Sequence, residues 1–88
     1  LGELVNLEEL EKFWRGKLKR EVALVARPDK RRGMNLFLFY EGIELDLARW
    51  NTSLPGPERI TEATAVDLLP RSELGKIDRS ALAKFDKD

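Results

Sequence analysis

One lysine stands out as a residue that could do chemistry, and it lies near the end of the chain. Lys76 follows Gly75 in the stretch Leu69–Arg79, which has the sequence LPRSELGKIDR. A proline and a glycine bracket a short polar loop, so the lysine is expected at an exposed turn. Its ammonium is a compact cation with rotatable donors, suited to bridging anions whose charge increases in a transition state. The rest of the chain is expected to be a scaffold that presents Lys76.

The Gly75-Lys76 pair also invites comparison with a phosphate-binding loop. That motif requires a glycine five residues before Gly75 and a serine or threonine directly after the lysine. Pro70 and Ile77 occupy these two positions, so the sequence excludes a phosphate loop. The dipeptide alone is weak evidence for a function, because a lysine on a loop is most often only solvated.

The composition limits the classes of protein to which the chain can belong. Its 88 residues suit one small domain with a modest core, not a complete enzyme of ordinary size. The 16 basic and 16 acidic side chains cancel, which argues against a nucleic-acid partner and a polybasic membrane anchor. Cysteine and histidine are absent, so no metal site is expected, and a cytoplasmic location fits. No apolar run approaches the roughly 20 residues of a transmembrane segment.

Apolar spacing predicts the elements of the first half of the chain. Asn6 and Glu9 make a helix-capping pattern, and a helix is expected from about Leu7, with the charged residues, Glu11 among them, on its solvent face. Two strands, Val22–Ala26 and Met34–Tyr40, should then form an antiparallel pair, since the turn between them contains proline and glycine. Met34, Leu36, Leu38 and Tyr40 are expected on one face of the second strand.

The second half of the chain predicts shorter elements. A short helix is expected at Glu44–Asn51, a strand at Ala63–Leu68, and a final helix from about Ser80. The order predicts an α+β fold, a small sheet of about three strands packed against helices, with a hairpin remnant at Leu4 and Val5. Residues 1–88 are expected to form a single domain.

The context of Lys76 closely resembles the C-terminal signature of the adenylate-forming enzymes, the superfamily of acyl-CoA synthetases, nonribosomal-peptide adenylation domains and luciferases. The signature residues are Leu69–Arg71, Gly75–Arg79 and Ala81-Leu82. Gly2–Val5, followed by an acidic helix start, resembles the segment after the interdomain hinge of that family, and Val22–Tyr40 resembles its central pair of strands. The resemblance therefore covers nearly the whole chain.

This resemblance implies that residues 1–88 are the mobile C-terminal subdomain of a larger, AMP-binding ligase. Such a ligase uses ATP with Mg, bound mainly by the N-terminal domain of the same polypeptide, to activate a small-molecule carboxylic acid. Coenzyme A, or the phosphopantetheine of a carrier protein, then accepts the acyl group. Fatty acid metabolism in the cytoplasm is the expected setting, and the isolated chain is expected to be inactive.

The resemblance also implies roles for individual residues. Lys76 is the catalytic lysine that enters the active site during adenylation. Pro70, Arg71 and Gly75 belong to the loop that positions it. After rotation, a hairpin on the other face lies beside pantetheine, and it consists of Gly2, Glu3, Leu4 and Val5.

Several features have alternative interpretations. The chain could be a free-standing α+β interaction module without catalysis. Arg71 and Arg79 could contact phosphate, although a structural role for Arg79 at the helix start is favoured. Trp14 and Trp50 are better explained as core than as stacking residues. Scattered surface charge is likewise favoured over a phosphate site for the basic residues Lys17, Lys19, Arg20 and Lys30–Arg32.

Overall fold

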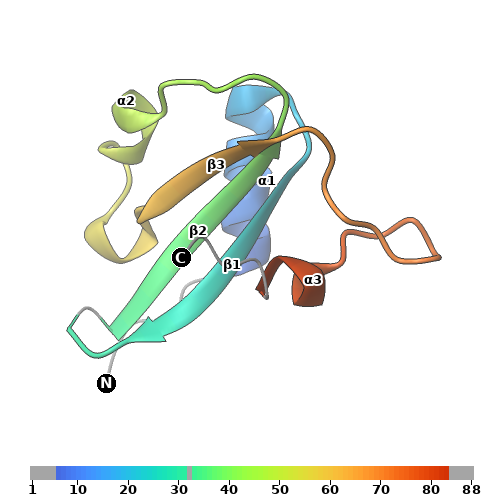
Figure 1. The fold of residues 1–88 in the computed structure, drawn as a ribbon. Helices are drawn as coiled ribbons and strands as arrows, with labels where there is room; N and C mark the ends of the chain where they lie inside the picture. Colours follow the sequence, from blue (N-terminus) through green and yellow to red (C-terminus); the bar gives the residue numbers. More distant parts are fainter. Residues whose placement is uncertain (1–5, 32, 84–88) are drawn as a thin grey trace.

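A computed structural model of the chain describes residues 6–31 and 33–83, and these contain three helices, three strands and one turn of 3-10 helix (Figure 1). The elements are α1 (Leu7–Leu18), β1 (Val22–Asp29), β2 (Gly33–Glu41), α2 (Ala48–Asn51), η1 (Gly56–Glu58), β3 (Glu62–Val66) and α3 (Arg79–Ala83). The predicted α+β class and the predicted order of helices and strands are confirmed. The hairpin remnant predicted at Leu4 and Val5 lies outside the described residues.

The sheet is mixed and has β2 in its centre. Its strand order is β1-β2-β3, with β1 antiparallel and β3 parallel to β2. Leu38 lies opposite Leu24 on one side and Ala63 on the other. The β1–β2 hairpin closes at Gly33, whose φ of 86° is a conformation that glycine adopts without strain. A parallel third strand needs the long connection that α2 and η1 supply.

Each face of β2 is buried against a different element. Leu36, Leu38 and Tyr40 point into a core shared with Trp14 of α1, and Figure 1 shows α1 behind the sheet. On the opposite face Phe39 packs in a second cluster whose other buried members are Ala23, Val25, Leu69 and Leu82. This alternation follows from the two-residue period of a strand. Trp14 is fully buried and Trp50 packs against the first core, as predicted.

Three predicted boundaries differ from the structure by two or more residues. The first strand continues to Asp29 instead of ending at Ala26, and in the other two cases side chains capture backbone groups. The α2 helix begins at Ala48 instead of Glu44, since the Leu45 N–H donates to the Tyr40 hydroxyl (2.8 Å) and the Ala48 N–H donates to the Asp46 carboxylate (3.1 Å). The third strand ends at Val66 instead of Leu68. There the Leu69 N–H donates to a carboxylate and not to a neighbouring strand.

No helix among residues 6–31 and 33–83 is long and apolar enough to cross a membrane.

Leu38→Ala should destabilise the fold far more than Met34→Ala, although both side chains project from the same face of β2. Leu38 is fully buried, whereas Met34 is 49% exposed next to the turn that closes the β1–β2 hairpin. The expected losses in the free energy of unfolding are about 2–5 kcal/mol for Leu38→Ala and under about 1 kcal/mol for Met34→Ala. Urea denaturation measures both values, and equal losses would show that the first core is placed wrongly.

Candidate functional site

Residues 70–78 form a small hairpin that carries Lys76, and we call it the lysine hairpin. Arg71 and Ile77 form an antiparallel bridge. The Ser72 N–H donates to the Lys76 carbonyl (2.7 Å) and the Asp78 N–H donates to the Pro70 carbonyl (2.8 Å). The backbone at Lys76 is therefore fixed by hydrogen bonds while its side chain is exposed. Figure 1 shows this segment projecting from the domain between β3 and α3.

The tip of the lysine hairpin is a tight turn closed by glycine. The Gly75 N–H donates to the Ser72 carbonyl (2.9 Å), and Gly75 has a φ of 83°. Ser72 also accepts from the Leu74 N–H through its hydroxyl (3.3 Å). Leu74 itself is 84% exposed. The exposed loop that was predicted between Pro70 and Gly75 is therefore this tight turn.

Glu41, at the end of β2, holds the N-terminal side of the lysine hairpin. Its Oε2 accepts the Leu69 N–H at 2.8 Å and lies 3.2 Å from Nη2 of Arg71. Both bonds are charge-assisted, which makes them stronger than neutral hydrogen bonds. Arg71 therefore has a structural partner in the fold, although its side chain is 38% exposed.

Glu11, in α1, holds the C-terminal side. Its carboxylate accepts the Leu24 N–H at 2.7 Å and Nε of Arg79 at 3.1 Å, and a second bond joins Nη2 of Arg79 to Oε1. The hydrogen bonding of Arg79 to Glu11 raises the pKa of Arg79 above its ordinary value. Burial opposes this effect, and the attraction of the Glu11 and Glu8 charges adds to it. Arg79 thus has a structural role in the fold, and its partner is Glu11. Asp78 instead caps α3 by accepting the Ala81 N–H at 3.2 Å.

The prediction that Glu11 lies on the solvent face of the helix is wrong, because its exposure is only 3%. Glu11 lies three and seven residues before Trp14 and Leu18, which are both buried, so it shares their face of α1. A buried carboxylate is tolerated when hydrogen bonds replace its contacts with water. The bonds to Leu24 and Arg79 do so here.

The predicted site residues thus fall into two groups. Pro70, Arg71, Gly75 and Lys76 are brought together in the lysine hairpin. Gly2, Glu3, Leu4 and Val5 lie outside the described residues. Sequence reasoning missed Glu11 and Glu41. For Glu11 the available signal in the sequence was its position, one helical turn before Trp14, which is buried.

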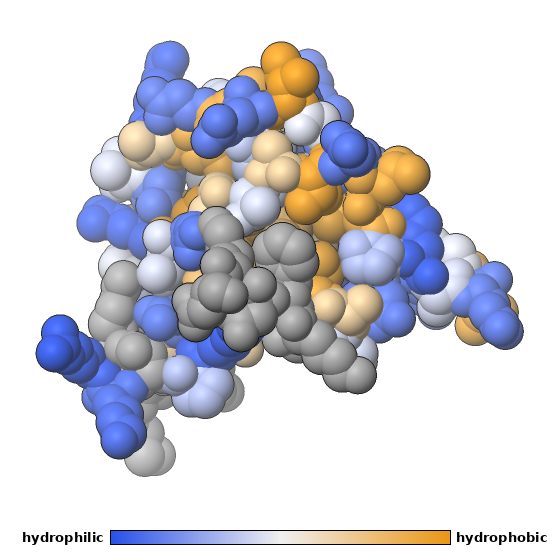
Figure 2. Space-filling model, in the orientation of Figure 1, coloured by the Kyte–Doolittle hydropathy of each residue, from blue (hydrophilic) through white to orange (hydrophobic). Residues whose placement is uncertain are grey.

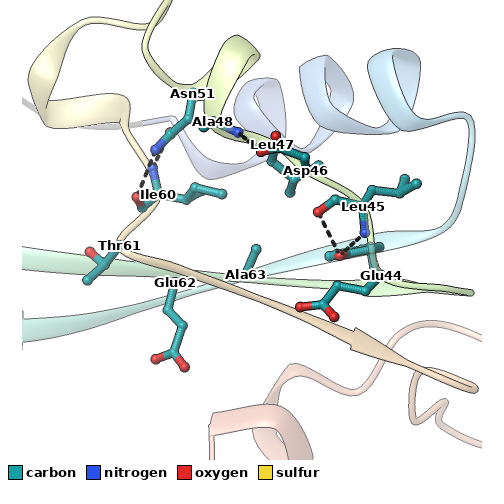
Figure 3. Close-up of a pocket in the computed structure, with 11 residues that line it drawn as sticks. Glu44, Leu45, Asp46, Leu47, Ala48, Asn51, Ile60, Thr61, Glu62 and Ala63 are labelled. Carbon is teal, nitrogen blue, oxygen red and sulfur yellow. Dashed lines mark hydrogen bonds between the residues drawn. The ribbon is translucent and has the colours of Figure 1, made fainter.

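A hollow of about 530 Å³ lies away from the lysine hairpin, between the segment leading into α2 and the start of β3 (Figure 3). Asn51 spans it by accepting the Ile60 N–H (2.8 Å) and donating to the Ile60 carbonyl (3.2 Å). Glu44, Asp46 and Glu62 contribute acidic side chains, and Glu62 extends away from α2 in Figure 3. These carboxylates make the hollow acidic, and no residue of the lysine hairpin lines it.

Charged side chains are spread over the surface. Figure 2 shows hydrophilic side chains at the end of the β1–β2 hairpin, where Lys30 and Arg31 are exposed. Arg20 instead binds the carbonyls of Glu41 (3.3 Å) and Ile43 (3.1 Å). The basic residues therefore do not form one surface, and Arg20 has a structural role.

No model of a protein family matches the sequence, and a comparison with curated protein sequences gave no match. Solved structures do match, and they place the fold among those of the adenylate-forming enzymes. The amide bond synthetase McbA from Marinactinospora thermotolerans is similar with a TM-score of 0.82 and 18% identity, over 96% of this chain and 19% of that one. The fatty acyl CoA synthetase of Mycobacterium tuberculosis has a TM-score of 0.75 and 24% identity, over 92% and 18%.

A third match is a holo nonribosomal peptide synthetase (NRPS) protein that contains adenylation and PCP domains. Its TM-score is 0.70 and its identity 28%, over 89% of this chain and 14% of that one. The resemblance predicted from the sequence is thereby confirmed at the level of the fold. The chain spans less than a fifth of the length of each of these three proteins.

Gly75→Ala should destabilise the chain, whereas Gly16→Ala should stabilise it. An added methyl group meets no described atom within 4 Å at either position, so only the backbone conformation differs. At Gly75, with its positive φ, alanine should cost about 1 kcal/mol. In the helix at Gly16 it should add about 0.5–1 kcal/mol. Denaturant unfolding of both variants checks the signs, and a stabilising Gly75→Ala would contradict the tight turn.

Proposed function

We propose that residues 1–88 are the C-terminal lid subdomain of an ATP-dependent ligase that joins a carboxylic acid to coenzyme A or to a carrier protein. The observation that carries the proposal is the exposed Lys76 on a hydrogen-bonded hairpin, in a fold shared with adenylate-forming enzymes. The short span of the matches supports a larger N-terminal domain in the same cytoplasmic polypeptide. That domain would bind the acid and ATP with Mg.

Lys76 would assist the formation of the acyl-adenylate. In this step a carboxylate oxygen of the substrate forms a bond to the α-phosphorus of ATP, and the bond to the leaving pyrophosphate breaks. Both reactants are anions, so a positioned ammonium lowers the barrier to their approach. Within residues 6–31 and 33–83, Arg71 and Arg79 are paired with carboxylates, whereas no carboxylate pairs with Lys76. This contrast supports Lys76 as the cation of the hairpin that contacts the reacting anions.

The second half-reaction would use the opposite end of the chain. A pantetheine thiol attacks the acyl carbon, a thioester forms, and AMP leaves. We assign the contact with pantetheine, after the subdomain has rotated, to Gly2, Glu3, Leu4 and Val5, for which the sequence predicts a hairpin. One matched protein is named a fatty acyl CoA synthetase and another contains a PCP domain, so both acceptors are consistent with this proposal.

Lys76→Ala in the complete ligase should lower acyl-adenylate formation by about a hundredfold, because it removes a charge that acts in the transition state. Thioester formation from supplied acyl-adenylate should change little. ATP–pyrophosphate exchange measures the first step, and thioester production measures the second. Lys12→Ala, which removes an exposed lysine from α1, is the matched control.

Equal losses in the two steps would refute the assigned role of Lys76. A polypeptide without any nucleotide-binding part would favour the free-standing interaction module. Residues 1–88 alone should not turn over ATP, and adenylation by this chain would contradict the proposed division of labour between the two domains.

A further inference from the structure

The Glu11 carboxylate joins three parts of the fold that lie far apart in the sequence. It belongs to α1, accepts the Leu24 N–H of β1, and binds Arg79 at the first residue of α3. Glu11 and Arg79 are 68 positions apart. Arg79 follows Lys76 by only three residues. The carboxylate therefore helps to fix where the chain lies immediately after the lysine, together with the burial of Leu82.

The orientation of the lysine hairpin depends on its contacts with the rest of the fold, and these include the packing of Ile77 against the second cluster. The hydrogen bonds described within it, Ser72 to Lys76, Gly75 to Ser72 and Asp78 to Pro70, join hairpin residues only to one another. They set its shape but not its direction relative to the sheet. Polar contacts with the rest of the fold occur at Leu69 and Arg71, through Glu41, and at Arg79, through Glu11.

We propose that Glu11 and Arg79 form a positioning pair for adenylation, which aims Lys76 by fixing the C-terminal end of the lysine hairpin. This inference rests on the proposed function of Lys76. The pair itself touches no substrate, and it acts through the position of the lysine. Because a planar guanidinium bonds a carboxylate at two points, it fixes direction as well as distance, which a single contact does not.

The chain contains a matched control for this pair. Arg15 also approaches Glu11, with Nη2 4.0 Å from Oε1, but it does so along α1 with no connection to the hairpin. The side chains of Arg15 and Arg79 are 43% and 49% exposed, respectively. Arg79→Gln and Arg15→Gln therefore remove the same charge from the same carboxylate at similar exposure. They differ in that Arg79 hydrogen-bonds Glu11 at two points and attaches the lysine hairpin, whereas Arg15 only approaches the carboxylate from within α1.

In the complete ligase, Arg79→Gln should lower kcat for acyl-adenylate formation by about tenfold, since a small displacement of a catalytic group weakens an interaction made in the transition state. The KM for ATP and thioester formation from supplied adenylate should stay near their wild-type values. Arg15→Gln should leave all three unchanged. Arg79→Lys, which keeps the charge but loses the two-point bond, should recover only part of kcat.

A purely structural role would give a different result. In that case Arg79→Gln would lower thermal stability without the selective loss of kcat for adenylation, or would slow both half-reactions equally. Either result, or equal behaviour of Arg79→Gln and Arg15→Gln, overturns the positioning pair while leaving the proposed function of Lys76 in place.

A wild-type ligase that shows no adenylation would refute the proposed function instead. Amide hydrogen exchange at Asp78 then tests whether Arg79 attaches the lysine hairpin to Glu11, because the Asp78 N–H closes the base of the hairpin. Exchange at this amide at least about tenfold faster in Arg79→Gln than in Arg15→Gln supports the attachment. Equal rates overturn it.

Discussion

The structure depends on one buried carboxylate whose contacts with water have been replaced by protein. Glu11 is buried beside the free edge of β1, where an ion without hydrogen bonds would be strongly destabilising. The Leu24 N–H comes from β1, which is an edge strand of the sheet. Arg79 comes from α3, which packs near the opposite face. Burial of Glu11 therefore requires α1, β1 and α3 to take their places together.

The central strand explains why two separate helices are needed to cover such a small sheet. Because β2 alternates apolar side chains on both faces, neither face can be left to solvent. The twelve residues of α1 cover one face, whereas the other is closed by residues such as Leu69 and Leu82. These two leucines lie on either side of the lysine hairpin in the sequence. Their burial therefore holds both ends of the hairpin close to the sheet and leaves its tip exposed.

Local patterns in the sequence predicted most of this fold, since helix caps, strand alternation and turn residues act over a few positions. The cap at Asn6, the strand at Met34–Tyr40 and the turn at Gly75 all depend on such local rules. Glu11 could not be placed in this way. Its charge assigns Glu11 to solvent unless a partner is known, and here the partner is 68 positions away. The end of β3 was misplaced for a similar reason, because the carboxylate of Glu41, at the end of β2 and 28 positions away, binds the Leu69 N–H.

The carboxylates of Glu11 and Glu41 also distinguish the two arginines near the lysine hairpin from Lys76. An arginine on either side of Lys76 is bound within the fold, Arg71 by Glu41 and Arg79 by Glu11. A guanidinium held at two points is directional and stays protonated, so it is suited to fixing one segment against another. The ammonium of Lys76 has rotatable donors and is exposed, so it can follow an anion that approaches from outside the domain. In the proposed reaction the two residue types would not be interchangeable, because a lysine at position 79 would lose the two-point bond to Glu11 and an arginine at position 76 would replace a compact ammonium with a planar guanidinium.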